Sequence, residues 1–260
     1  MSARKSLWTI SALLALGLGN VHARDLEHRA LPKYIVAAVA DPARPATDTS
    51  RDADRKPAKT LAFAGVKPGD HVAELIPAGG YFTRLLSAVV GPAGKVYAVA
   101  PPGPPEPPPG EPAPAAAVQA IAADAHYSNV TVSVQRVSRL ELPERVDLIW
   151  TSQNYHDFHN VPNIDVLNID KAVFRALKPG GIYLVLDHAA AAGSGFRDTA
   201  TLHRIDPDAV KREVIAAGFA LDAESDALHN KADPHTAKVF APEIRGHTDQ
   251  FILRFKKPQS

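Results

Sequence analysis

Residues 71–83 read His-Val-Ala-Glu-Leu-Ile-Pro-Ala-Gly-Gly-Tyr-Phe-Thr, an apolar run that passes through a glycine-containing turn into a second apolar run. The pattern predicts a strand over residues 71–76 and a helix over residues 81–90. Glycine in the turn lets a ligand approach the backbone, and the first helical amides can donate hydrogen bonds to it. This order is typical of the first unit of an open parallel sheet.

The alternation of strands and helices continues along the chain. Further strands are predicted over residues 95–100, 130–134, 146–151, 181–187 and 219–225, and helices over residues 113–126, 164–177 and 206–217. Residues 250–256 alternate like an edge or antiparallel strand. We therefore expect a doubly wound α/β domain with a seven-stranded, mostly parallel sheet and one antiparallel strand near the C-terminus.

The composition excludes several classes of function. Basic and acidic residues nearly balance, 29 against 28, so the net charge of +1 gives no general attraction for nucleic acid. The absence of cysteine removes disulfides, thiolate metal sites and thiol nucleophiles. Any chemistry must come from histidine, carboxylate, hydroxyl or amide groups, or from a cofactor.

Residues 1–23 have the pattern of a signal peptide. Arg4 and Lys5 precede an apolar run over residues 7–19, and Val21-His22-Ala23 offers a cleavage site. The run is shorter than the roughly 20 residues that span a bilayer. We expect an exported, periplasmic protein without stable membrane insertion, in which residues 24–60 form an N-terminal cap and residues 61–257 the main domain.

The cap contains a polar helical segment near Thr47. The spacing of its charges predicts pairs of Asp48 with Arg51 and of Asp52 with Lys56 on a solvated face. In the alternative interpretation, Arg51 or Arg55 reaches over a binding cleft as part of a lid.

Motifs between residues 44 and 257 follow a known pattern. They are Val66–Asp70, Glu74, Pro77–Thr83, Gly91–Val99, Val146–Trp150 and Ala176–Leu186, with Asn154–Asp157, Leu186–His188 and Leu202–Asp206. With the first six the chain resembles the class I S-adenosylmethionine-dependent methyltransferase superfamily. The last three make it similar to a group of exported predicted methyltransferases of unknown substrate.

The resemblance implies a Rossmann-like fold and methyl transfer from S-adenosylmethionine to an unidentified small molecule. Mapped onto this sequence, it implies cofactor binding by residues of the first turn and of two later strand ends. These residues are Glu74, Pro77, Ala78, Gly79, Gly80, Tyr81, Ala100 and Asn154.

The chain departs from the superfamily pattern at three places. Ile76 and Ala78 replace glycines, Ala100 replaces a common ribose-binding carboxylate, and Gln135-Arg136 replaces an acidic residue near the adenine. Losing one charge-assisted hydrogen bond costs about 1.5 to 3 kcal/mol, so weakened binding is implied. A nicotinamide cofactor is disfavoured because its Gly-x-Gly-x-x-Gly fingerprint is missing. A turn that binds nothing is the other alternative.

Residues 101–114 are rich in proline and predict an extended polyproline loop beside the second strand. Glu106 or Glu111 could replace the missing ribose carboxylate. The alternatives are a docking segment for a partner and a stiff solvated loop.

Polar residues cluster after two predicted strands whose carboxyl ends share one edge of the sheet. His156, Asp157, Asp187 and His188 are the candidates for catalysis, with a histidine as the base. Tyr155, His203 and Arg204 are the candidates for substrate binding, and Arg204 suits a carboxylate. Each histidine could instead hold loops together by hydrogen bonds. Asp206, before Pro207, is predicted to cap a helix.

No metal site is predicted, because the histidines show no recognised ligand spacing. Two other functions stay open. The first is an exported binding or scaffold protein with a degenerate methyltransferase fold, and the second is a cofactor-independent enzyme that uses histidine and aspartate.

Overall fold

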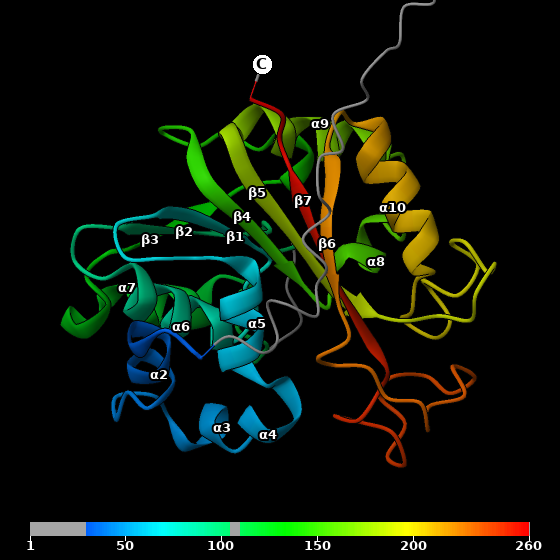
Figure 1. Ribbon diagram of the computed structural model, residues 1–260, viewed down its shortest axis with the longest axis horizontal. Helices are drawn as coiled ribbons and strands as arrows, with labels where there is room; N and C mark the ends of the chain where they lie inside the picture. The colour runs from blue at the N-terminus through cyan, green and yellow to red at the C-terminus, as the bar shows by residue number, and fades with distance from the viewer. Residues whose placement is uncertain (1–29, 105–109, 260) are drawn as a thin grey trace, which may run out of the picture.

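A seven-stranded sheet in the order β3-β2-β1-β4-β5-β7-β6 forms the centre of the molecule (Figure 1). The computed structural model describes residues 30–104 and 110–259. The strands are β1 (His71–Leu75), β2 (Lys95–Ala100), β3 (Val130–Val134), β4 (Val146–Ser152), β5 (Leu177–His188), β6 (Ala220–Ser225) and β7 (Gln250–Lys256).

Strands β1 to β5 pair in parallel, and β7 runs antiparallel to both β5 and β6. The predicted sheet, with its antiparallel strand near the C-terminus, is confirmed. The alternative of an edge position for residues 250–256 is wrong, because β6 is the edge. Both faces of β7 are apolar and buried, as expected of a strand inside the sheet with both faces covered. The buried residues are Phe251, Ile252, Leu253 and Phe255.

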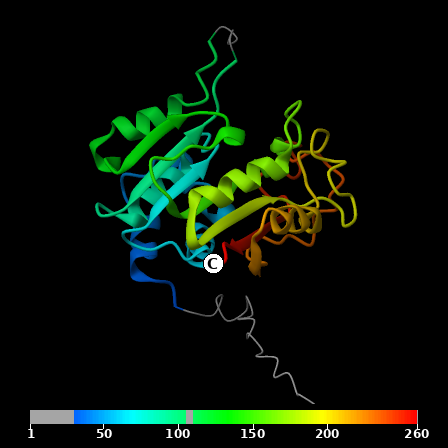
Figure 2. The same ribbon diagram turned by 90° about the horizontal axis from the view of Figure 1, so that it is seen from above.

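Helices cover both faces of the sheet (Figures 1 and 2). They are α2 (Lys33–Val39), α3 (Ala46–Thr49), α4 (Asp52–Arg55), α5 (Pro57–Ala64), α6 (Tyr81–Val90), α7 (Ala116–Ala123), α8 (Tyr155–Phe158), α9 (Val166–Ala176) and α10 (Pro207–Ala216), with short 3-10 turns η1 (Ala125–Tyr127) and η2 (Val137–Arg139). One face carries α2, α5, α6 and α7, and the other carries α8, α9 and α10.

The alternation of side chains along each strand builds two cores. In β4, Leu148 and Trp150 pack with α5 and α6, whereas Ile149 packs with α9 on the opposite face. Both sets are apolar because both faces are covered, as expected for parallel strands. The sheet is thereby fixed on both sides, and its carboxyl edge is a rigid platform for polar side chains.

The cap differs in its ion pairs from the prediction. Asp48 pairs with Arg84 on α6, and Asp52 pairs with Arg44. The predicted pairs of Asp48 with Arg51 and Asp52 with Lys56 do not form because α3 ends at Thr49 and a new helix begins at Asp52. These ion pairs tie α3 and α4 to the segment before them and to α6.

The structure leaves part of the sequence interpretation untested. The predicted signal peptide, residues 1–23, and Glu106 lie outside the described residues. Among the described residues, no helix combines the length and apolar character that crossing a bilayer requires.

Candidate functional site

The turn after β1 keeps the backbone shape of a glycine turn although two of its residues are not glycine. Ile76 has a φ of 51°, Ala78 of 49° and Gly80 of 77°. The left-handed region costs a residue with a Cβ about 1 to 2 kcal/mol. Retention of such a shape indicates a constraint from the surroundings, and strained turns of this kind concentrate at binding sites.

Asn154 holds this turn against the end of β4. Its side-chain amide donates to the backbone oxygens of Leu75 and Ile76, at 3.1 Å each, and to Ser152 at 3.1 Å. Its side-chain oxygen accepts from the Thr151 hydroxyl. Asn154, predicted to bind cofactor, therefore positions the turn that borders the cavity.

A cavity of about 260 Å³, which we call the central cavity, lies at the carboxyl ends of β1 and β4. In open α/β sheets, ligands bind at this edge. Six of the predicted cofactor residues line it, together with Asp157 and both arginines of the proposed lid. The lining residues include Glu74, Pro77, Ala78, Gly79, Tyr81, Asn154, Asp157, Arg51 and Arg55.

Glu74 is the more deeply buried of two buried acids that line the central cavity; the other is Asp48. Only 3% of the surface of Glu74 is exposed, and the Thr83 hydroxyl donates to its carboxylate at 2.5 Å. Burial raises the pKa of Glu74 to about 8, against the opposing effects of that hydrogen bond and of Arg55. The carboxyl group is thus largely protonated at neutral pH and is poised to ionise beside a cation.

Arg55 crosses the cavity from the cap. Its guanidinium lies 4.6 Å from the ring centroid of Tyr81 and donates to the side chain of Gln153. Burial and the nearby Arg51 lower the pKa of Arg55 to about 10. Gln153 was not predicted from the sequence; its φ of 59° and its place directly after β4 mark it as a constrained residue at the site.

A second cavity, of about 330 Å³, adjoins the turn on the side of β2 and β3, and we call it the proline cavity. Pro101, Pro102, Gly103 and Pro104 line it with Arg136, and Phe158 and Ile169 add apolar surface. Ile76 lines both this cavity and the central one. The side chain that replaces the first glycine thus stands between the two spaces.

A third cavity, of about 220 Å³, shares Arg51, Arg55 and Gln153 with the central one, and we call it the arginine cavity. Arg245 and His188 also line it. The His188 ring accepts from or donates to the Thr248 hydroxyl at 2.7 Å, and burial lowers the pKa of His188 to about 4. His188 is therefore neutral at physiological pH.

The other predicted catalytic residues form a connected group. The Asp187 carboxylate lies 2.8 Å from His156 Nδ1 and also accepts from the backbone N–H of His156. Burial disfavours the charged form of His156, but Asp187 outweighs it and raises the pKa of His156. On the far side of the ring, Nε2 lies 3.3 Å from His203 Nδ1 and 3.3 Å from Asp157 Oδ1.

Two predicted substrate-binding residues point away from the cavities. Arg204 has no exposed surface and forms a buried ion pair with Asp233 at 2.8 Å. Tyr155 is also fully buried, and its hydroxyl contacts Asp170 and Glu213. Both predictions are wrong because these long side chains turn inward and join neighbouring loops and helices.

Two predicted cofactor residues also lack access. Ala100 is fully buried in the core. Gly80 caps α6, and a Cβ there would lie 2.1 Å from Ile121 Cδ1, so packing against α7 requires this glycine. Neither residue lines the central or the proline cavity. Glu111 is exposed and lines neither, whereas Asp206 caps α10 as predicted.

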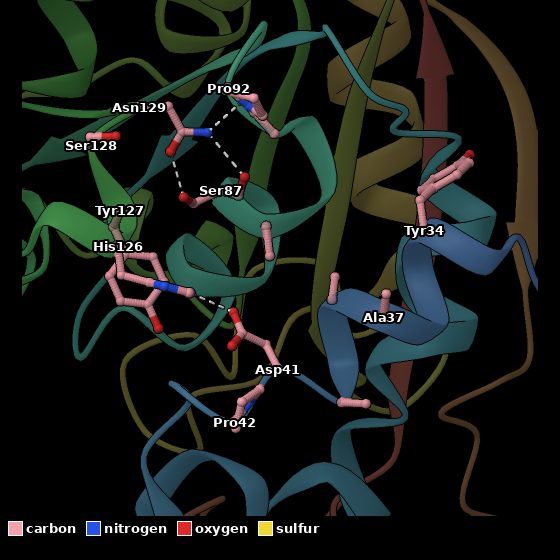
Figure 3. A pocket seen from close by; sticks show the side chains of 14 residues that line it. Tyr34, Ala37, Asp41, Pro42, Ser87, Pro92, His126, Tyr127, Ser128 and Asn129 are labelled. Carbon is pink, nitrogen blue, oxygen red and sulfur yellow. Dashed lines mark hydrogen bonds and ion pairs between the residues drawn. The ribbon is translucent and has the colours of Figure 1, made fainter.

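A larger cavity, of about 510 Å³, lies between α2 and the end of α6 (Figure 3). Ser87 and Gly91, near the start of β2, and Asn129, before β3, place it at the amino edge of the sheet. Several of its polar groups bond to one another: Asn129 contacts Ser87 and Gly91, and His126 lies 2.8 Å from Asp41. The buried hydroxyl of Tyr127 has no hydrogen-bond partner among the described residues. The carboxyl edge, with its buried acid and two arginines, is the better candidate site.

No model of a known protein family and no curated protein sequence matches this chain. Solved structures do match. A SAM-dependent methyltransferase from Aquifex aeolicus is 18% identical with a TM-score of 0.57, over 85% of this chain and 97% of its own. The glycopeptide N-methyltransferase MtfA, solved with S-adenosylmethionine, is 17% identical with a TM-score of 0.52, over 80% and 87%.

The 4+2 cyclase SpnF is also similar, at 17% identity and a TM-score of 0.58, over 87% of this chain and 92% of its own. At such identities the likeness shows the fold alone. This chain has the class I S-adenosylmethionine-dependent methyltransferase fold, and the predicted resemblance is confirmed at that level. A cyclase among the similar structures illustrates that the fold does not fix the reaction.

Proposed function

We propose that the protein transfers a methyl group from S-adenosylmethionine to a small anionic acceptor. The observation that carries this proposal is the turn of residues 76–80, which keeps left-handed backbone at Ile76 and Ala78 beside a cavity containing a buried acid and two arginines. Backbone strain of this kind concentrates at binding sites, which supports a ligand beside this turn.

The charges of the central cavity complement the methionine part of the cofactor. Glu74 would accept from its ammonium group, and Arg51 and Arg55 would bind its carboxylate. The adenosine would occupy the proline cavity, where apolar side chains and Arg136 offer stacking surfaces. The bound cofactor would supply an electrophilic methyl group on sulfur, and the chain would hold the acceptor in line with it.

The arginine cavity supports an anionic acceptor. Arg51, Arg55 and Arg245 line it with a single carboxylate, Asp54, which lies 3.4 Å from the ring of His247. Neutral His188 lines the same space and can form a hydrogen bond with the acceptor. A carboxylic acid with a hydroxyl or amino group has the chemistry that this lining would recognise.

We also propose export to the periplasm, which rests on the pattern of residues 1–23. Since the cofactor is made in the cytosol, an exported enzyme would require its supply across the membrane. Separation of cell fractions followed by N-terminal sequencing tests this part on its own: a mature chain that begins at Met1 in the cytosol would contradict it.

Calorimetric titration with S-adenosylmethionine and S-adenosylhomocysteine tests the function, with Ile76→Gly and Ala78→Gly compared with wild type. Ile76 lines both cavities, so we expect Ile76→Gly to connect them and to tighten binding. Ala78→Gly relieves similar backbone strain at a residue that lines the central cavity alone, and it serves as the matched control. Equal affinities of Ile76→Gly and wild type would count against the two-cavity placement. No binding by any of the three would remove the cofactor.

A further inference from the structure

Three ligand atoms converge beside the central cavity. His156 Nε2 lies 3.3 Å from Asp157 Oδ1 and 3.3 Å from His203 Nδ1, and the remaining pair, His203 Nδ1 and Asp157 Oδ1, is 3.7 Å apart. We call these three residues the triad. All its ligand atoms lie within 4.8 Å of one another, and this is the cluster that the described residues provide for a metal.

The size of this triangle fits a small cation. A tetrahedral zinc ion binds imidazole nitrogen and carboxylate oxygen at about 2.0 to 2.2 Å, which separates neighbouring ligand atoms by about 3.3 to 3.6 Å. The observed separations of 3.3, 3.3 and 3.7 Å match these edges to within a few tenths of an ångström. Small rotations of the side chains would therefore complete the site without backbone movement.

The surroundings orient the ligands as metal sites require. Asp187 lies 2.8 Å from His156 Nδ1, which places the lone pair of His156 on Nε2, toward the triad. Asp187 is itself held by the backbone N–H groups of His156 and His188. His203 adopts a φ of 55°, an unfavourable conformation that aims its ring at His156.

One side of the triad is open. The side chain of Asp157 is 46% exposed and that of His203 24%, while His156 is 3% exposed and forms the floor. Asp157 also lines the central cavity, so an ion held by the triad would reach a ligand bound there. Three protein ligands with a free position are typical of catalytic metal sites rather than structural ones.

We propose that His156, Asp157 and His203 bind a divalent transition-metal ion, with zinc or iron(II) as the ions that suit two imidazoles and one carboxylate. An ion there would bind an acceptor oxygen and favour loss of its proton. The sequence predicts no metal site, because His203 lies 47 residues after His156, a separation that no local spacing reveals.

A second group of histidines serves as a contrast, because their ring nitrogens do not surround a common point. His229 and His235 lie 2.7 and 2.9 Å from opposite oxygens of Asp249. Each imidazole is satisfied by its own carboxylate oxygen, so their nitrogens bond to the acid rather than surround a common point. His229, 44% exposed, is therefore a suitable control position.

Titration of untagged, metal-stripped protein with Zn²⁺ and Co²⁺ tests the proposal, followed by calorimetry and by the ligand-field absorption of Co²⁺. We expect one ion per chain, with affinity reduced at least about tenfold in Asp157→Asn and in His203→Gln and unchanged in His229→Gln. No cofactor is present, so the result is independent of the proposed methyl transfer.

Unaltered Zn²⁺ affinity in both Asp157→Asn and His203→Gln would overturn the proposal. So would the absence of Zn²⁺ binding by the wild type at about 100 μM ion. At that concentration even a weak site, with a binding free energy of about −5.5 kcal/mol, is half filled. Far-ultraviolet circular dichroism without metal confirms that each variant is folded. Because Asp157 is half-exposed, Asp157→Asn is the variant expected to fold normally and decides the matter if His203→Gln does not.

Discussion

The carboxyl group of Glu74 shows how one residue links the fold to a ligand. It is the penultimate residue of β1, accepts a hydrogen bond from Thr83, and lines the central cavity. Burial makes its charged form unfavourable, so binding a cation at this group must displace its proton. This property should be visible in the pH dependence of cofactor binding.

Between pH 6 and 7, we predict that the affinity for S-adenosylhomocysteine rises with pH by up to about tenfold per unit, because binding an ammonium requires a proton to leave Glu74. The rise ends near pH 8, the pKa of Glu74 in the free protein. Glu74→Gln should bind more weakly and lose this pH dependence. Glu111→Gln, an exposed glutamate outside the cavities, is the control, and calorimetry at three pH values is the measurement.

Ala78 provides a residue-scale test of strain. Its φ of 49° is costly for alanine and free of strain for glycine. We expect Ala78→Gly to raise the free energy of unfolding by about 0.5 to 1 kcal/mol, after allowance for the greater flexibility of glycine in the unfolded chain. Urea denaturation measures it. A loss of stability would mean that the turn is not strained at this residue.

Arg245 tests the acceptor class, because it lines the arginine cavity but not the central one. Arg245→Gln should weaken the binding of small carboxylic acids at least about tenfold while leaving S-adenosylhomocysteine binding unchanged. A thermal-shift screen of hydroxy and amino acids identifies the ligands for this comparison. If Arg245→Gln lowers the affinity for both ligands to the same extent, Arg245 has a structural role instead.

At the scale of elements, the strands and helices follow the sequence closely because their periodicity is local. Helix α6 and strands β2 and β7 have the predicted bounds, and β1 ends one residue early, at Leu75. The long predicted helix of residues 113–126 divides into α7 and η1, because the side chain of Asp124 accepts from the backbone of His126 and caps a new turn.

The segment between β6 and β7 is an element whose anchoring is not visible in the sequence. Asp233 lies in it, fully buried, and holds Arg204 before α10. We predict that Asp233→Asn lowers the free energy of unfolding by about 3 to 5 kcal/mol, since it leaves a buried guanidinium unpaired. Glu224→Gln breaks an exposed pair with Lys211 and should cost no more than about 1 kcal/mol. Similar effects of both changes in chemical denaturation would contradict the anchoring.

For the whole molecule, topology explains which parts of the site could be predicted. Residues that end strands were placed correctly at the carboxyl edge, because parallel strands bring these ends together. His203 and Arg204 are neighbours in sequence, but their side chains lie in different places. The His203 ring contacts His156, whereas Arg204 is buried in an ion pair with Asp233. Gln153 and Arg55 meet across 98 residues. Such contacts depend on tertiary packing and leave no periodic signal.

The most direct test of the proposed function is a crystal structure of the protein grown with S-adenosylhomocysteine at about 1 mM, a concentration that fills half of even a site of about −4 kcal/mol. The methionine part should lie in the central cavity, with its ammonium at Glu74 and its carboxylate at Arg51 or Arg55, and the adenosine should lie beyond Ile76 in the proline cavity. A ligand found elsewhere, or none bound, would contradict the account.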